Sequence, residues 1–174
     1  NQIGVEHEII DIEVDEIIDS NQSPQENVRA LSVLKCQEGV RKVIMEEKSV
    51  FPVLTADTIV VFEGKIFGKP VSESDAIRML MQLSGKTHSV ITGVTIGVIS
   101  SNQAKFHTLS VESSVEFTKL VRDDCLKYCE TNEPFDKAGG YGIQGYGSAF
   151  VKKINGRYSN IVGLPIHAVI ELLK

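Results

Sequence analysis

A single carboxylate, Asp57, lies inside an apolar, β-branched run from Thr55 to Phe62 that predicts an interior strand. A buried carboxylate costs free energy unless it is paired, hydrogen-bonded or bound to a metal. On its own, Asp57 fits a structural interpretation, a strand-end side chain that accepts hydrogen bonds from backbone N–H groups. A turn at Glu63-Gly64 and the segment Gly68-Lys69-Pro70 come directly after the strand. A carboxylate and a lysine beside one strand are typical of a site for metal and phosphate.

Other charged residues could join the same site. Asp15-Glu16 ends a predicted strand, Lys35 falls within a predicted helix, and Asp136-Lys137 precedes a glycine-rich stretch. Each has an ordinary alternative: a solvated strand end, a surface lysine and an exposed ion pair. Together with Asp57 and Lys69 they fit a Mg²⁺-assisted phosphate site. Their spacing in the sequence leaves open whether they converge.

The glycine-rich stretch from Gly139 to Gly147 lacks the spacing of a P-loop or of a dinucleotide fingerprint. Two interpretations stand: a turn that leads into a strand, or a loop whose backbone N–H groups approach a ligand closely. Within it, Gln144 carries both a donor and an acceptor, which the edge of a nucleobase requires.

The elements that must position these residues can be read from periodicity. His7 to Val14 alternates as a strand, and Ser23, Pro24 and Glu26 predict the start of a helix that runs to about Glu47. The further predictions are a strand to Phe62, a short strand 65–67, a helix capped by Ser72 and ended by Gly85, a hairpin of 87–99 with 105–117, a helix 121–130, a hairpin of 149–154 with 157–162 through Asn155-Gly156, and a final helix 165–174. This order predicts an α/β fold with a mixed sheet rather than a doubly wound parallel sheet.

Composition narrows the class of protein. The chain has 174 residues, which suits one domain, and a formal net charge of −5 without a basic cluster, which argues against a nucleic-acid groove. No segment has the length of a membrane span and no signal peptide is seen. Three cysteines, an odd number, argue against a disulfide framework and favour the cytoplasm. Cys125 and Cys129 are interpreted as packing residues rather than metal ligands.

Five blocks together resemble the Maf family of nucleoside triphosphate pyrophosphatases. They span nearly the whole chain and are Ala56–Val60, Gly68–Pro70, Leu83–Val94, Glu133–Gly145 and Asn160–Pro165. The resemblance implies an inosine-triphosphatase-like α/β fold, with a mixed sheet flanked by helices, two lobes around a central cleft, and a homodimer. The block from Glu133 to Gly145 is similar to that of the branch acting on dTTP and UTP, with CTP and modified pyrimidine nucleotides as further candidates.

The resemblance also implies roles for individual residues. Asp57 matches the family's proton acceptor, while Thr58 and Gln144 match positions that influence the choice of substrate. Glu16, Lys35 and Lys69 match charged positions of the family's site. We therefore expect Lys35 and Lys69 to bind phosphates, and Glu16 and Asp57 to hold Mg²⁺ or Mn²⁺.

The sequence departs from the family at its start. The family opens with a strand and a Ser-x-Ser-Pro-Arg-Arg loop, whereas Gln2 to Val5 resembles the segment that comes after that loop and its helix. We expect a preceding strand, loop and helix of roughly 15–25 residues, by the usual lengths of such elements, so that residues 1–174 form one Maf-like domain without that segment. The missing arginines leave a second hypothesis, a nucleotide-binding regulatory module, related to cell division, without significant turnover.

Overall fold

The computed structural model describes residues 6–46, 52–100 and 103–174. Its strands and helices are, in chain order, α1 (Pro24–Met45), β1 (Val53–Phe62), β2 (Lys65–Phe67), α2 (Glu73–Leu83), β3 (Thr87–Ser100), β4 (Gln103–Phe117), α3 (Arg122–Cys129), the 3-10 helices η1 (Glu133–Asp136), η2 (Ala138–Gly140) and η3 (Tyr146–Phe150), β5 (Val151–Asn155), α4 (Tyr158–Val162) and α5 (Ile166–Leu172).

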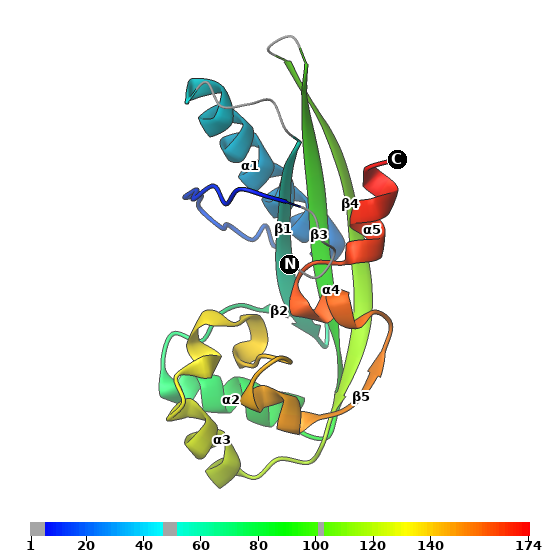
Figure 1. Cartoon of the computed structure of the whole chain (residues 1–174). Helices are drawn as coiled ribbons and strands as arrows, with labels where there is room; N and C mark the ends of the chain where they lie inside the picture. The colour runs from blue at the N-terminus through cyan, green and yellow to red at the C-terminus, as the bar shows by residue number, and fades with distance from the viewer. Residues whose placement is uncertain (1–5, 47–51, 101–102) are drawn as a thin grey trace.

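The strands form one sheet in the order β2-β1-β3-β4-β5 (Figure 1). The hairpin of β3 with β4 is confirmed, although its turn at 101–102 lies outside the described residues. β3 is the central strand, and its residues 90–97 are all buried, because both faces of the sheet are covered there. The expected α/β class is confirmed. All pairings between the described strands are antiparallel, so no parallel pair of a mixed sheet is among them.

Helices lie on both faces of this sheet (Figure 1). On one face α1 packs through Val28 against Ile59 and Ile91. On the other face α5 packs through Val169 against Val94, and α4 lies beside it. The alternation of side chains along β1 and β3 therefore decides which residues face α1 and which face α4 and α5.

The sequence holds α1 close to the sheet. Its start is fixed by a capping box, in which the Ser23 side chain accepts from the backbone of Glu26 and the Glu26 carboxylate accepts from the backbone of Ser23. Its approach is fixed by a missing side chain: a β-carbon at Gly93 would stand 2.4 Å from the carbonyl oxygen of Val28. Only glycine permits this spacing between helix and strand, so α1 lies directly on β3.

A second lobe lies beyond β2 and contains α2, α3 and the 3-10 helices (Figure 1). Its core includes Leu80 and Leu83 of α2, Phe117 of β4, and both cysteines of α3. Cys125 and Cys129 are buried free thiols, which confirms their interpretation as packing residues.

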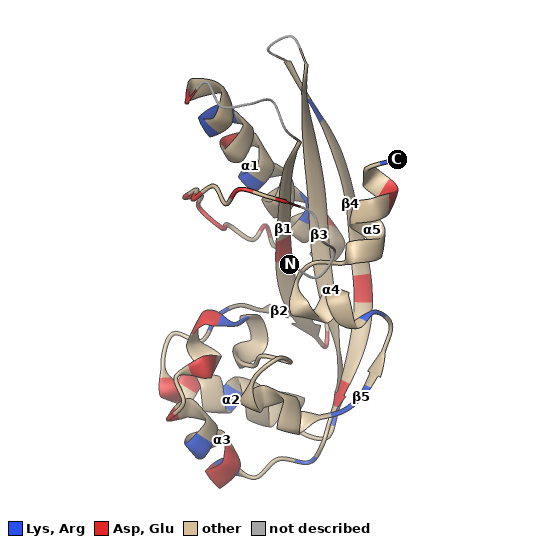
Figure 2. Cartoon of the chain, in the orientation of Figure 1, with Lys and Arg blue, Asp and Glu red and all other residues tan. Residues whose placement is uncertain are grey.

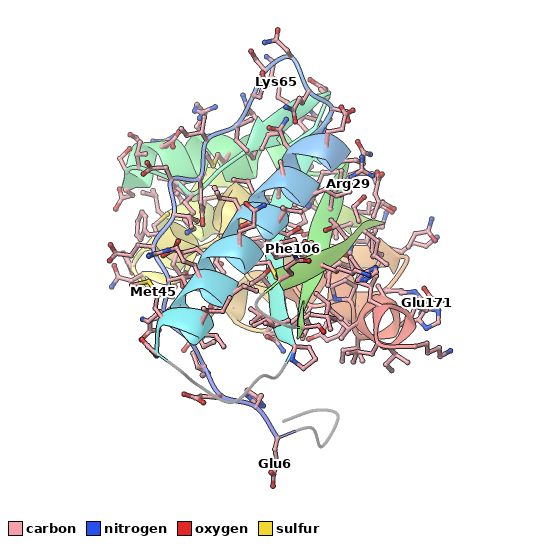
Figure 3. The ribbon with its side chains drawn as sticks, turned by 90° about the horizontal axis from the view of Figure 1, so that it is seen from above. Glu6, Arg29, Met45, Lys65, Phe106 and Glu171 are labelled. Atoms are coloured by element: carbon pink, nitrogen blue, oxygen red, sulfur yellow. The ribbon has the colours of Figure 1, made fainter. Side chains whose placement is uncertain are left out.

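The strand expected from His7 to Val14 is wrong. This segment has no regular secondary structure and pairs with none of the described strands. It runs beside α1 instead, as Figure 3 shows from above, and the Lys42 ammonium donates to the carbonyl oxygen of Asp11. Ile10 packs against the cluster of Cys36, Val40, Val43 and Val53. The apolar alternation does mark a segment with a covered side, but a helix rather than a strand covers it.

The second strand of the hairpin expected at 157–162 is also wrong. β5 ends at Asn155 and pairs with β4, while residues 158–162 form the helix α4. The Asn160 side chain decides this, because its amide donates to the carbonyl oxygen of Val90 at 3.0 Å and to Ser113 Oγ at 3.1 Å from a fully buried position. Tertiary hydrogen bonds thus override the local turn signal of Asn155-Gly156.

Candidate active site

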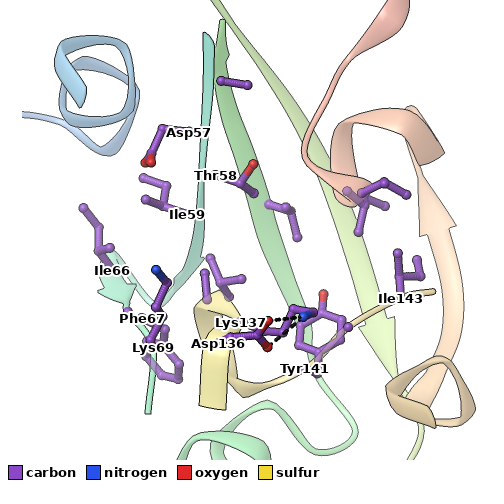
Figure 4. A pocket seen from close by; sticks show the side chains of 18 of the residues that line it. Asp57, Thr58, Ile59, Ile66, Phe67, Lys69, Asp136, Lys137, Tyr141 and Ile143 are labelled. Atoms are coloured by element: carbon purple, nitrogen blue, oxygen red, sulfur yellow. Dashed lines mark hydrogen bonds and ion pairs between the residues drawn. The ribbon is translucent and has the colours of Figure 1, made fainter. Parts of the chain in front are cut away.

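A pocket of about 490 Å³ lies between the two lobes, along one edge of β1 (Figure 4). β2 pairs with β1 only at residues 60–62, so the preceding part of this edge has no strand partner among the described residues. The upper lobe in Figure 1, which contains α1 and most of the sheet, contributes Glu16, Lys35 and the middle of β1. The second lobe, with α2 and α3, is the lower one. The lower lobe contributes Lys69 and the loop that carries Gln144. The cleft between two lobes that the resemblance implied is therefore present.

Asp57 and Thr58 reach this pocket from opposite faces of β1, as Figure 4 shows. Successive side chains of a strand alternate between faces. Asp57 points toward α1, where it bonds to Lys35, and Thr58 points toward β3 and α4, where it bonds to Thr92. Both line one pocket because the pocket lies along the strand's free edge. A ligand at this edge can contact both side chains.

Lys35 links two carboxylates. Its Nζ lies 2.7 Å from Glu16 Oε1 and is hydrogen-bonded to Asp57 Oδ1. The side chains of Asp57 and Lys35 are 10% and 19% exposed, so water screens this ion pair only partly. Asp57 Oδ2 makes no hydrogen bond to any described residue. The carboxylate therefore keeps one oxygen for a ligand or a water molecule.

Glu16 reaches the site because its segment is tied to α1. The Asn27 side chain, 2% exposed, accepts from the backbone N–H of Asp19 at 2.8 Å and donates to the Asp19 carbonyl oxygen at 2.9 Å. This pair of bonds imitates a backbone ladder and fixes the turn between the segment and α1. Asp15, by contrast, is exposed and does not line the pocket.

The three charges shift each other's pKa. Burial raises the pKa of Asp57, and the Glu16 carboxylate adds to this, although the bond to Lys35 acts in the opposite direction. Burial acts to lower the pKa of Lys35, but its hydrogen bonds to Asp57 and Glu16 outweigh burial and raise that pKa. The bond to Lys35 lowers the pKa of Glu16. One ammonium is thus shared by two carboxylates, which leaves an excess of negative charge.

This arrangement fits a divalent cation. One oxygen of Glu16 and one of Asp57 both contact the ammonium nitrogen of Lys35. The two carboxylates therefore create a region in which positive charge is favoured. Mg²⁺ is commonly held by one or two carboxylates together with substrate phosphates. The described residues contain no group of three or more metal-ligating side chains. Glu16 and Asp57 would therefore hold the ion together with the substrate rather than alone.

Lys69 and Lys137 bring positive charge to the lower side of the pocket (Figure 4). Lys69 forms no ion pair with a described side chain, but its charge helps to lower the pKa of Glu16 and opposes the rise in the pKa of Asp57 that burial causes. Lys137 lies 2.7 Å from Asp136 Oδ1. The ordinary interpretation of Asp136-Lys137 as an ion pair is confirmed, and the pair also lines the pocket. Elsewhere Lys and Arg are scattered over several elements, while acidic residues are distributed along the segment that precedes α1 (Figure 2).

One residue that the sequence did not single out organises the glycine-rich loop. Glu133 accepts hydrogen bonds from the backbone N–H of Tyr146 at 2.7 Å, the N–H of Gly147 at 3.0 Å and the Tyr128 hydroxyl at 2.8 Å. These bonds lower its pKa against the opposing effect of burial. Gln144 lies in the same loop, exposed, on the pocket wall. A carboxylate eleven residues before Gln144 gives no local signal that it would close this loop.

The structure brings together all six residues predicted for the site, since each lines the pocket: Glu16, Lys35, Asp57, Thr58, Lys69 and Gln144. Sequence reasoning missed the apolar wall from α4 and the buried Thr92 behind Thr58.

None of the helices in the described part of the chain is both long and apolar enough to cross a membrane.

The sequence model of one family, described as Maf-like protein, matches residues 1–174. The chain belongs to the Maf family. Among its Maf relatives, a protein of Caldicellulosiruptor bescii named dTTP/UTP pyrophosphatase is 43% identical over 173 residues, which cover 99% of this chain and 85% of the relative. A protein of Aliivibrio fischeri with the same name is 40% identical over 172 residues, covering 99% and 88%. A third, from Bacillus thuringiensis subsp. konkukian, is 43% identical over 171 residues, covering 98% and 85%.

Proposed function

We propose that this Maf protein hydrolyses pyrimidine nucleoside triphosphates, dTTP and UTP first, to the monophosphate and pyrophosphate. The observation that carries the proposal is the convergence of Asp57, Glu16, Lys35 and Lys69 on one pocket that also presents polar groups suited to a nucleobase. The names of the relatives support the same substrates. CTP and modified pyrimidine nucleotides remain further candidates.

In the proposed reaction, water attacks the α-phosphorus and the bond to the oxygen that bridges the α- and β-phosphorus atoms breaks. Asp57 accepts the proton of the attacking water through its free oxygen, and its raised pKa makes it a stronger base than an exposed aspartate. Lys35 and Lys69 stabilise the negative charge that develops on the leaving pyrophosphate. Mg²⁺ or Mn²⁺ held by Glu16 and Asp57 would supply charge neutralisation and a more acidic water.

The test is release of pyrophosphate from a panel of dTTP, UTP, CTP, ATP and GTP, with Mg²⁺ or Mn²⁺ and the full-length protein. We expect turnover of dTTP and UTP, and a loss of about 10²- to 10⁴-fold in kcat for Asp57→Asn, the usual contribution of a general base. Asp123→Asn, which changes an exposed carboxylate on α3, is the matched control. Equal turnover by wild type and Asp57→Asn would remove Asp57 from the catalytic role.

Two further expectations accompany this proposal. The buried, unpaired state of all three cysteines supports a reducing compartment, the cytoplasm. A homodimer is proposed from the family resemblance, and light scattering of the purified protein measures it. A monomer at micromolar concentration would contradict it.

A further inference from the structure

Thr58 belongs to a chain of hydrogen bonds whose direction can be worked out. Thr58 and Thr92 are direct cross-strand partners on β1 and β3, and their Oγ1 atoms lie 2.9 Å apart. Thr92 Oγ1 also lies 2.9 Å from the carbonyl oxygen of Asn160 in α4. Thr92 and Asn160 are fully buried, so no bulk water substitutes for these partners.

The carbonyl oxygen of Asn160 can only accept. A hydroxyl has one hydrogen and two lone pairs. Two oxygens at 2.9 Å repel unless a hydrogen lies between them, so the hydrogen of Thr92 points to Asn160. Thr92 is then left with lone pairs toward Thr58. The hydrogen of Thr58 must therefore point to Thr92.

This direction decides what Thr58 can offer in the pocket. Its only hydrogen is used internally, so the hydroxyl of this half-buried, pocket-lining residue offers lone pairs alone to a ligand. The glycine at the end of α4 leaves it uncovered: a β-carbon at Gly163 would stand 3.4 Å from Thr58 Oγ1. A ligand acceptor placed here would meet another acceptor.

We propose that Thr92 is a positioning residue that makes Thr58 an obligate hydrogen-bond acceptor, so that this wall of the pocket selects a nucleoside group that donates a hydrogen. This inference rests on the proposed function and goes beyond it, because it names the polarity of the group that is recognised. Two groups of a pyrimidine nucleotide have this chemistry: the imide N3–H of uracil and thymine, and a sugar hydroxyl.

The test compares substrates that lack one donor at a time. N3-methyl-UTP against UTP removes the imide donor, and 2′,3′-dideoxy-TTP against dTTP removes the sugar donor. In the wild type we expect one of the two losses to lower kcat/KM by roughly tenfold, mainly through KM, as for one hydrogen bond. In Thr58→Val that fall in kcat/KM should shrink to the part that comes from the altered shape of the substrate analogue. The pair that responds identifies the donor.

Thr92→Val tests the positioning role. It removes the acceptor of the Thr58 hydrogen, so Thr58 still accepts but can now also donate. We therefore expect a several-fold gain in relative kcat/KM for the analogue that presents an acceptor in place of the responding donor, which is CTP against UTP for the imide or 3′-fluoro-3′-deoxy-TTP against dTTP for the sugar hydroxyl. Thr92→Ser keeps the hydroxyl and should keep the wild-type discrimination against that analogue. A variant that merely loosens the fold would lower turnover of both substrates of a pair equally, which thermal unfolding also reports.

The outcomes are distinct. If no nucleoside triphosphate is hydrolysed by the wild type, the proposed function fails. If turnover is present but both penalties are the same in Thr58→Val as in the wild type, the inference about Thr58 is overturned while the function stands. If the penalty shrinks in Thr58→Val but the discrimination against the acceptor analogue is the same in Thr92→Val as in the wild type, Thr92 does not set the polarity.

Discussion

At the scale of single residues, neighbours in sequence take different roles because they face different surroundings. Asp57 faces α1, where burial raises its pKa while Lys35 holds one of its oxygens. Thr58, the next residue, faces the buried threonine of β3. A strand edge makes this possible, since both faces are reached from one pocket. Substitution of Asp57 should therefore affect the chemical step, whereas substitution of Thr58 should affect the discrimination between substrates.

Another residue-scale effect concerns stability rather than catalysis. His88 is 3% exposed, its Nε2 lies 2.7 Å from the Tyr141 hydroxyl, and its ring meets Phe117 edge to face. Burial lowers its pKa to about 4. The unfolded chain binds a proton near pH 6.5 and the folded chain does not. The resulting stability is present above about pH 6.5 and is lost as the pH falls toward 4.

We predict that wild type loses about 3 kcal/mol more in its free energy of unfolding between pH 7 and pH 4 than His88→Phe does, by proton linkage. Urea unfolding at several pH values measures the difference. His107→Phe, which replaces an exposed histidine on β4, is the matched control and should follow the wild type. Parallel pH curves for wild type and His88→Phe would show that His88 titrates normally in the folded protein.

At the scale of elements, α1 carries Lys35 to β1, and the glycines of β3 set the distance between α1 and the sheet. A β-carbon at Gly93 would overlap the backbone of Val28, and one at Gly97 would stand 2.9 Å from Cys36 Sγ. Because α1 cannot approach this closely over a side chain, the distance from Lys35 to Asp57 depends on Gly93, which is the cross-strand partner of Asp57, and on Gly97.

We predict that Gly93→Ala destabilises the protein by roughly 1–3 kcal/mol, the cost of overpacking, and lowers kcat further than the fraction unfolded explains. Val98→Ala, an exposed position on the same strand, is the control and should change both little. Thermal unfolding and pyrophosphate release measure the two effects. Full activity in a destabilised Gly93→Ala would separate the distance between α1 and the sheet from catalysis.

The loop that carries Gln144 depends on the carboxylate of Glu133. Glu133→Gln replaces one acceptor oxygen by an NH₂ group, which then faces a backbone N–H of Tyr146 or Gly147. We predict a several-fold rise in KM with a smaller change in kcat, since Gln144, which this loop carries to the pocket, is the residue proposed to contact the nucleobase.

Steady-state kinetics on dTTP measures this split, with Glu130→Gln, an exposed residue at the end of α3, as the control. A fall in kcat at constant KM would place Glu133 in the chemical step instead.

At the scale of the whole molecule, the two lobes meet at the pocket and share two strands of the sheet. β3 and β4 continue from the upper lobe into the core of the lower one, through Val90, Val115 and Phe117. The described residues show no group of three metal ligands that could act as a structural metal site. We therefore expect the fold to form without the divalent ion proposed for the reaction.

We predict that EDTA abolishes pyrophosphate release and leaves the unfolding temperature of the free protein unchanged within a degree or so. Mg²⁺ together with dTTP should raise that temperature in Asp57→Asn, because binding to the folded state stabilises it. Added Mg²⁺ or Mn²⁺ restores turnover in the wild type. Unfolding caused by EDTA would reveal a structural metal, and turnover that survives EDTA would contradict the role given to Glu16 and Asp57.

Local patterns in the sequence determined the elements whose signals are chemical and short in range. The capping box at Ser23, the β-branched run of β1 and the long β3–β4 hairpin all formed as predicted. The predicted site residues also share one pocket, to which both lobes contribute.

Tertiary structure alone decided the rest. The alternation of apolar and polar residues at 7–14 is typical of any segment with one covered face. Only the position of α1 shows that a helix covers this face. Asn155-Gly156 favours a hairpin locally, but the buried hydrogen bonds of Asn160 outweigh that preference. The polarity of Thr58 depends on Thr92 and on a carbonyl 102 residues away in sequence from Thr58, because hydrogen-bond direction is a property of the whole chain of partners.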